Sequence, residues 1–160
     1  MVFGIISLAA AAALVVADQL IKLAVTTQLQ QVGSVTLIPN LLELKNTQNF
    51  GAAFSMMSGS TIIFIIITAV VCLALLIGLF LYKRHNWLSY IASTMIIAGG
   101  VGNLIDRIFN EGNYVTDYIH ISFFPAIFNF ADMLVVVGVI LLVVYLLFFA
   151  AKKDKKKKHS

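Results

Sequence analysis

The stretch "NFADMLVVVGVILLVVYLLFFAAKK", residues 129–153, decides the fold class of this chain. Every residue between Asp132 and Lys152 is uncharged, and nearly all of them are apolar. A helix needs about 20 such residues to cross the hydrocarbon core of a bilayer. The run therefore predicts a membrane-spanning helix over residues 128–150, with one carboxylate, Asp132, close to its beginning.

The composition of the whole chain also indicates an integral membrane protein. Of its 160 residues, 61% are hydrophobic and 11% are charged, and the mean hydropathy is +0.98, whereas soluble domains are about 45–50% apolar and about 25% charged. Three further apolar runs, at residues 2–25, 61–82 and 87–109, are long enough to span a membrane. The first is similar to a secretory signal peptide but lacks a positively charged start, so we interpret it as a retained helix. We expect an all-α membrane protein with one four-helix domain over residues 1–150 and a basic tail over 151–160.

The distribution of positive charge predicts the orientation of these helices. Eight of the eleven cationic residues are Lys83 and Arg84, between the second and third runs, and the six lysines of the tail. Cytoplasmic segments are enriched in lysine and arginine, so both termini are expected in the cytoplasm. The tail is then a topology anchor or a contact for anionic lipid, not a nucleic-acid site. Six of the seven carboxylates would lie at or near the outer face: Asp18, Glu43, Asp106, Glu111, Asp117 and Asp132.

The first outer segment, about residues 26–60, is expected to form more than a linker. The segments "VTLI" and "LLELKN" are rich in β-branched or alternating residues, and Pro39-Asn40 supplies a turn signal between them. This pattern predicts a small hairpin or sheet that rests on the membrane. The apolar stretch "GAAFSMM" that follows suits a segment at the membrane interface.

Neither cysteine nor histidine suggests a metal or redox site. The single cysteine, Cys72, lies in an apolar run and is interpreted as an inert core or lipid-facing residue. The three histidines are far apart and lack metal-ligand spacing. We therefore expect no metal.

Polar residues at the ends of the apolar runs form five clusters that need an explanation, because such groups are costly in a membrane and usually face the bundle interior. Each cluster has an ordinary interpretation: an intrahelical ion pair, a turn, an anchor at the headgroups, a solvated loop residue, or an acid that complements a helix dipole. The clusters are Asp18 and Lys22 in "DQLIK", Asn49 and Gly51 in "NFGAAF", Asn103, Asp106 and Arg107 in "GNLIDR", Asp117 in "VTDY", and Asn129 and Asp132 in "FNFAD".

Taken together, the clusters favour a catalytic site. Asp117 and Asp132 flank one outer loop at the membrane depth of the other polar residues. Two carboxylates that converge share a proton near neutral pH, and such a pair activates water in aspartic proteases. A small transporter is the main alternative, but it predicts ionisable residues near the bilayer midplane and often internal repeats. A non-catalytic assembly subunit is another, and it predicts that Asp117 and Asp132 do not converge.

The five motifs, in this order and along four apolar runs, resemble the bacterial lipoprotein signal peptidases, or signal peptidase II. The resemblance implies a multi-pass aspartic endopeptidase of the bacterial cytoplasmic membrane, with its active site at the extracytoplasmic face. It would cleave the signal peptide from prolipoproteins just before a diacylglyceryl-modified cysteine. Implied partners are these substrates and membrane lipid, with no nucleic acid and no cofactor, and we expect a monomer.

The resemblance also implies roles for particular residues and for the first outer segment. Asp117 and Asp132 would be the catalytic dyad. The family's extracytoplasmic β-cradle and interfacial helix would lie between the first two spans, in residues 26–60. The supporting or substrate-contacting positions would be Asp18, Lys22, Asn49, Gly51, Asn103, Arg107 and Asn129.

Overall fold

The computed structural model describes residues 1–51 and 61–150, and it contains four long helices. Each is long and apolar enough to cross a membrane, as the sequence predicts. The basic tail and nearly all of the "GAAFSMM" segment lie outside the described residues. The helices are α1 (Val2–Val32), α2 (Thr61–Leu81), α3 (Trp87–Phe109) and α4 (Phe130–Tyr145), the last extended by a π-helical turn, η2 (Leu146–Ala150).

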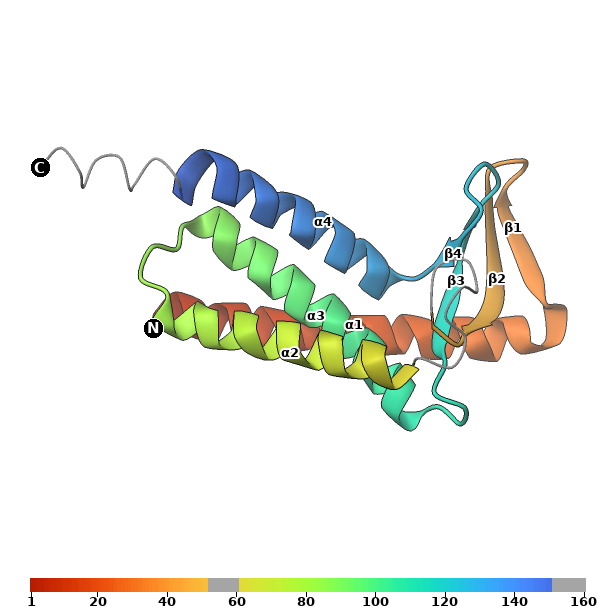
Figure 1. Cartoon of the computed structure of the whole chain (residues 1–160). Coiled ribbons are helices and arrows are strands. Elements are labelled where there is room, and N and C mark those ends of the chain that lie inside the picture. Colours follow the sequence, from red (N-terminus) through yellow and green to blue (C-terminus); the bar gives the residue numbers. More distant parts are fainter. Residues whose placement is uncertain (52–60, 151–160) are drawn as a thin grey trace, which may run out of the picture.

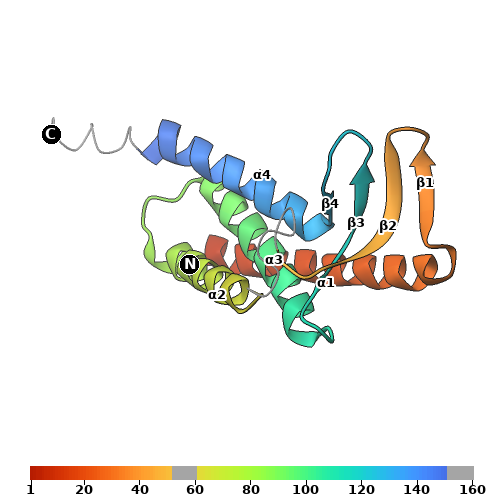
Figure 2. The same cartoon turned by 45° about the vertical axis from the view of Figure 1, so that its right-hand side comes forward.

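A small antiparallel sheet stands at one end of the helices, across the C-terminal part of α1 (Figures 1 and 2). The beginning of α1 and the end of α4 lie at the opposite end of the bundle (Figure 1). Of the helices, α3 is central, because it packs against α1, α2 and α4. The strands follow in the order β1 (Ser34–Ile38), β2 (Leu42–Asn49), β3 (Val115–Ile121) and β4 (Ile127–Phe128).

The first hairpin agrees with the sequence prediction, whereas α1 is longer than predicted. Strands β1 and β2 flank Pro39-Asn40, and Asn40 has a φ of 59°, as a tight turn often requires. Helix α1 continues to Val32 instead of ending near residue 25. Leu29 of this extra part is buried, and Gly33, with a φ of 76°, ends the helix.

The second outer loop also contributes strands, which the sequence analysis did not predict. Strand β3 pairs with β2, so that Asp117 lies opposite Thr47. Its sequence "VTDYIHI" is rich in β-branched and aromatic residues, a recognisable strand signal. Asp117 is therefore part of a sheet and is not a solvated loop residue.

Close packing of α3 against α4 fixes the start of α4. An added Cβ at Gly99 would collide with the carbonyl oxygen of Ala131, and one at Gly138 would lie 2.8 Å from the Ile96 side chain. Small residues at these positions let the two backbones approach each other, as is common in membrane bundles. The first turn of α4 is thereby held beside the polar end of α3.

Candidate active site

Helix α4 begins with a capping box that orients Asp132. The side chain of Asn129 accepts a hydrogen bond from the backbone N–H of Asp132 at 2.9 Å. In return, Asp132 Oδ2 accepts one from the backbone N–H of Asn129 at 3.1 Å. These reciprocal bonds satisfy two backbone donors that the helix itself leaves free. The carboxylate of Asp132 is therefore held at the sheet end of the bundle.

Asp117 projects from β3 toward the same place and is only 2% exposed. Its Oδ1 accepts a hydrogen bond from Asn129 Nδ2 at 2.6 Å, and its Oδ2 accepts one from Asn49 Nδ2 at 2.8 Å. Burial, and then the negative charge of Asp132, raise the pKa of Asp117 to about 6, against the opposing effect of the two asparagine donors and of Lys22. The carboxyl group of Asp117 therefore gains or loses its proton close to neutral pH.

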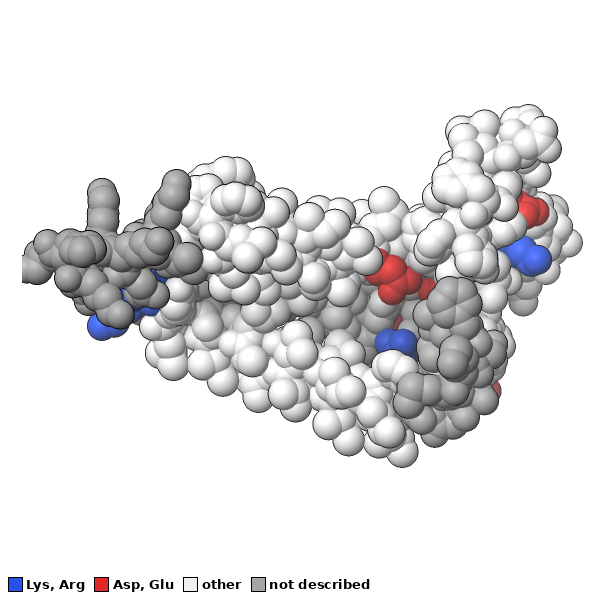
Figure 3. All heavy atoms as spheres, turned by 45° about the horizontal axis from the view of Figure 1, so that its top comes forward, with Lys and Arg blue, Asp and Glu red and all other residues white. Residues whose placement is uncertain are grey.

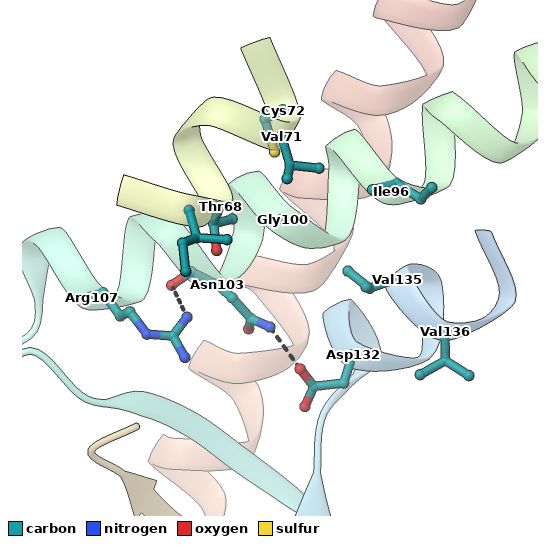
Figure 4. A pocket seen from close by; sticks show the side chains of 11 residues that line it. Thr68, Val71, Cys72, Ile96, Gly100, Asn103, Arg107, Asp132, Val135 and Val136 are labelled. Carbon is teal, nitrogen blue, oxygen red and sulfur yellow. Dashed lines mark hydrogen bonds between the residues drawn. The ribbon is translucent and has the colours of Figure 1, made fainter. Parts of the chain in front are cut away.

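Two asparagines link the carboxylates to each other. Asn103 on α3 donates from Nδ2 to Asp132 Oδ1 at 2.7 Å, and Figure 4 shows its amide pointing at that carboxylate. The Oδ1 of Asn103 in turn accepts from Asn129 Nδ2 at 3.1 Å. Because Asn129 also donates to Asp117, the two carboxylates belong to one hydrogen-bonded network that joins α3, α4 and β3.

Both carboxylates line a cavity of about 540 Å³, whose other walls are mostly apolar. A second cavity of about 300 Å³ extends between α2, α3 and α4 (Figure 4). Arg107, Asp132 and Val136 line both cavities. Asp132 is thus accessible from both largely apolar spaces, whereas Asp117 lines only the larger one. The other residues of the larger cavity are Asn49, Phe64, Phe124, Ala126, Ile127, Phe128, Met133 and Val137.

Arg107 provides a cation at the junction of the two cavities. Its Nη1 donates to the backbone oxygen of Asn103 at 3.3 Å, and its guanidinium carbon lies 5.9 Å from the centre of the Phe64 ring. Its Nε has no hydrogen-bond partner among the described residues. Arg107 therefore brings a positive charge to both cavities, while its buried Nε lacks a partner among the described residues.

The remaining residues predicted from the sequence join the same network. Asp18 and Lys22 form a buried ion pair of 2.9 Å, and Lys22 also donates to Asn103 at 3.1 Å. Gly51, with a φ of +108°, donates its backbone N–H to Asn49 at 3.0 Å. The structure therefore brings all the predicted site residues into one connected cluster.

Asp106 is the principal residue of this cluster that the sequence analysis did not place in the site. It is 5% exposed and forms a 3.0 Å ion pair with Lys22, so it does not anchor the helix end at the headgroups. It lies three residues after Asn103 and four after Gly102, on the same helical face. That spacing is the signal that could have identified it.

The distribution of charge on the surface agrees with the position of this cluster. Figure 3 shows acidic atoms, with basic atoms beside them, in a hollow near the sheet end of the molecule.

In residues 1–51 and 61–150, His, Cys, Asp and Glu side chains nowhere form a group of three or more able to hold a metal ion. The polar side chains that line the larger cavity are two carboxylates, one amide and one guanidinium.

The chain is similar to a known protein family over most of its length. The sequence profile of the family described as "Signal peptidase (SPase) II" matches residues 10–148. The chain belongs to the signal peptidase II family. A match to a peptidase family over almost the whole chain gives no support to the transporter alternative. The assembly-subunit alternative also conflicts with the structure, because Asp117 and Asp132 converge on one cavity.

Individual members and solved structures agree with this assignment. The lipoprotein signal peptidase of Caldanaerobacter subterraneus subsp. tengcongensis is 39% identical over 121 residues, which cover 76% of this chain and 81% of the relative. That of Lactiplantibacillus plantarum is 38% identical over 130 residues, covering 79% and 84%. A bacterial membrane enzyme solved by the in meso method at 2.3 Å resolution has a TM-score of 0.81 and 32% identity, covering 92% of this chain and 90% of that one. The chain is thus a membrane protease of the signal peptidase II fold.

Proposed function

We propose that this signal peptidase is an aspartic endopeptidase that uses Asp117 and Asp132 as its catalytic dyad. Its substrates are prolipoproteins, cleaved just before a cysteine that already carries a diacylglyceryl group. The observation that carries the proposal is the convergence of these two carboxylates on one cavity, each held by asparagine donors. A shared site and a shared hydrogen-bond network are what a proton-sharing pair requires.

In the proposed mechanism, the dyad binds a water molecule between its two carboxyl groups. The ionised aspartate takes a proton from this water as it attacks the scissile carbonyl carbon. The protonated aspartate donates a hydrogen bond to the carbonyl oxygen. The tetrahedral intermediate collapses when a proton passes to the leaving nitrogen. The pKa of Asp117, about 6, supports proton exchange at this position near neutral pH.

The neighbouring polar residues would orient the reacting groups. Asn103 and Asn129 restrict the rotation of the two carboxyl groups, because each donates to at least one carboxylate oxygen. The guanidinium of Arg107, which lines both cavities, would bind a carbonyl of the substrate backbone. Holding reactants in this way removes much of the entropic part of the barrier.

The position of the dyad suits a substrate that remains attached to the membrane. Asp132 lies in the first turn of α4 and Asp117 in the sheet beyond it, so the dyad stands at one end of the bundle. The apolar walls of the larger cavity, including Phe128 and Met133, would accept apolar parts of the lipidated segment. We place this end at the extracytoplasmic face, because Lys83 and Arg84 lie in the α2–α3 loop at the other end.

A processing assay tests the proposal. Purified protein would be incubated with a diacylglyceryl-modified prolipoprotein and with the same substrate lacking lipid. We expect cleavage of the lipidated form only, and accumulation of uncut precursor with Asp117→Asn and with Asp132→Asn. Glu111→Gln, in the exposed loop after α3, is the matched charge-removing control and should process normally. Near-normal processing by either dyad variant would refute the assignment.

A further inference from the structure

Asp106 holds the backbone directly beside Asp117. This side chain is almost completely buried, and its Oδ2 accepts a hydrogen bond from the backbone N–H of Thr116 at 2.9 Å. Thr116 immediately precedes Asp117 in β3. The position of Asp106 on α3 therefore fixes where the strand presents Asp117.

Asp18 has the corresponding relation to Asp132. It is 0% exposed, and its Oδ1 accepts a hydrogen bond from the backbone N–H of Ala131 at 3.1 Å. Ala131 immediately precedes Asp132 in the first turn of α4. An added Cβ at Gly102 would lie 2.6 Å from Asp18 Oδ2, so only glycine leaves room for Asp18 to reach α4.

Lys22 joins these two carboxylates. Its Nζ lies 2.9 Å from Asp18 Oδ2 and 3.0 Å from Asp106 Oδ2. Gln19 bridges them a second time, since its Nε2 donates to Asp18 at 3.2 Å and to Asp106 at 3.0 Å. Lys22 also donates to Asn103, which donates directly to Asp132. The cluster thus connects α1 and α3 to both dyad-bearing segments.

We propose that Asp106 is a positioning residue for the dyad, acting through Thr116, and that with Asp18 and Lys22 it sets the separation of Asp117 and Asp132. The proposal rests on the proposed function, because it assumes that these two aspartates are catalytic. A purely stabilising role accounts less well for the arrangement. Buried ion pairs contribute little net stability compared with apolar packing, yet here both acids accept from the residue before a dyad aspartate.

The charge of the cluster also acts on the dyad. The charged groups that surround Asp117 are Lys22 and Asp18 on α1, Asp106 and Arg107 on α3, and Asp132 on α4, while the neighbouring residue of β2 is the neutral Asn49. Replacing Asp106 by asparagine removes one negative charge and leaves the charge of Lys22 less compensated. Ionised carboxylates then become more favourable, so the pH–activity profile is expected to move to lower pH.

The test uses Asp106→Ala and Asp106→Asn in the full-length protein, with the processing assay of a diacylglyceryl-modified substrate and with thermal unfolding in detergent. Asp106→Ala removes the acceptor of the Thr116 N–H, and we expect kcat to fall about 10- to 100-fold with little change in KM. Asp106→Asn is isosteric and keeps an oxygen for Thr116, so we expect a smaller loss of kcat together with the shift of the pH profile. If the alanine variant does not fold, the asparagine variant decides.

Two outcomes separate this inference from the proposed function. A lower melting temperature with unchanged kcat and pH profile would make Asp106 a structural residue only and overturn the inference. This result leaves the dyad intact if Asp117→Asn, assayed in parallel, is inactive. If Asp117→Asn instead processes the substrate normally, the dyad assignment fails, whatever Asp106 does.

Discussion

The hydrogen bond from Asn49 to Asp117 offers a quantitative test of the electrostatics of the dyad. Asn49→Ala removes a donor that lies 2.8 Å from Asp117 Oδ2 and stabilises the ionised carboxylate. A hydrogen bond to a charged group contributes about 1.5–3 kcal/mol, and one pKa unit corresponds to about 1.4 kcal/mol. The pKa of Asp117, about 6 in the intact protein, should therefore rise by roughly 1–2 units.

The assay is the pH dependence of kcat/KM for cleavage of a diacylglyceryl-modified peptide. Its two limbs report apparent pKa values of the pair. We expect one limb to move to higher pH by about 1–2 units. Movement of the alkaline limb would identify Asp117 as the member that carries the proton, and movement of the acid limb would identify it as the base.

The controls separate this effect from a change in the local backbone. Asn49 also accepts the backbone N–H of Gly51, and alanine loses this contact too. Asn49→Asp keeps an acceptor for Gly51 but loses the donor and adds a negative charge, so it should shift the limb at least as far. Gln48→Ala, at the neighbouring exposed position of β2, should leave the profile unchanged. A profile that stays in place or moves to lower pH in Asn49→Ala would refute the reasoning.

Three further predictions concern stability. Folding raises the pKa of Asp117 from 3.8 to about 6, so this residue stabilises the folded protein fully below about pH 4, and ~3 kcal/mol of stability is lost as the pH rises through about 6. Asp117→Asn should not show this loss when the free energy of unfolding is measured from pH 4 to 8, and an unaltered pH dependence in this variant would contradict the pKa shift. Gly99→Ala, which forces a Cβ against the backbone of α4, should cost about 1–3 kcal/mol, whereas Gly78→Ala, with open space around the added Cβ, should be neutral or slightly stabilising in the same melting experiment. Asn86→Ala removes the N-cap of α3, which accepts from Ser89 at 2.9 Å, and should cost about 1 kcal/mol with no change in kcat/KM, because it lies at the end of α3 away from the dyad.

The sequence predicted the helices well because their signal is strong and local. Long uncharged runs have few alternatives in a membrane, and the four predicted spans agree with α1 to α4 within a few residues except at the C-terminal end of α1. There the residues 26–32 are polar enough to suggest a loop, yet they stay helical beside the sheet. Hydropathy detects where a chain leaves the membrane, but not whether the helix continues in water.

The sequence could predict which residues gather at the candidate site, but not the contacts that those residues make between separate elements. Spacing places Asn129 beside Asp132 and Asn103 beside Arg107, because these pairs lie on single helices. No local pattern relates Asp106 to Thr116, or Asp18 to Ala131, since these contacts join separate elements through backbone N–H groups. The family resemblance supplied a set of residues, and the structure shows the contacts through which Asp18 and Asp106 reach α4 and β3.

The location of the dyad at the end of the helices follows from what its residues bind. Inside a membrane-spanning helix every backbone N–H is used by the helix itself, and only the first turn has free donors. In α4 those donors all find side-chain acceptors: the N–H groups of Phe130, Ala131 and Asp132 donate to Tyr118, Asp18 and Asn129, respectively. Side chains of β3 and α1 therefore bind α4 at its first turn, where the backbone N–H groups are free. The proposed dyad, which joins a helix to a strand, is therefore held where the helix begins, because its backbone N–H groups are free to bind side chains only there.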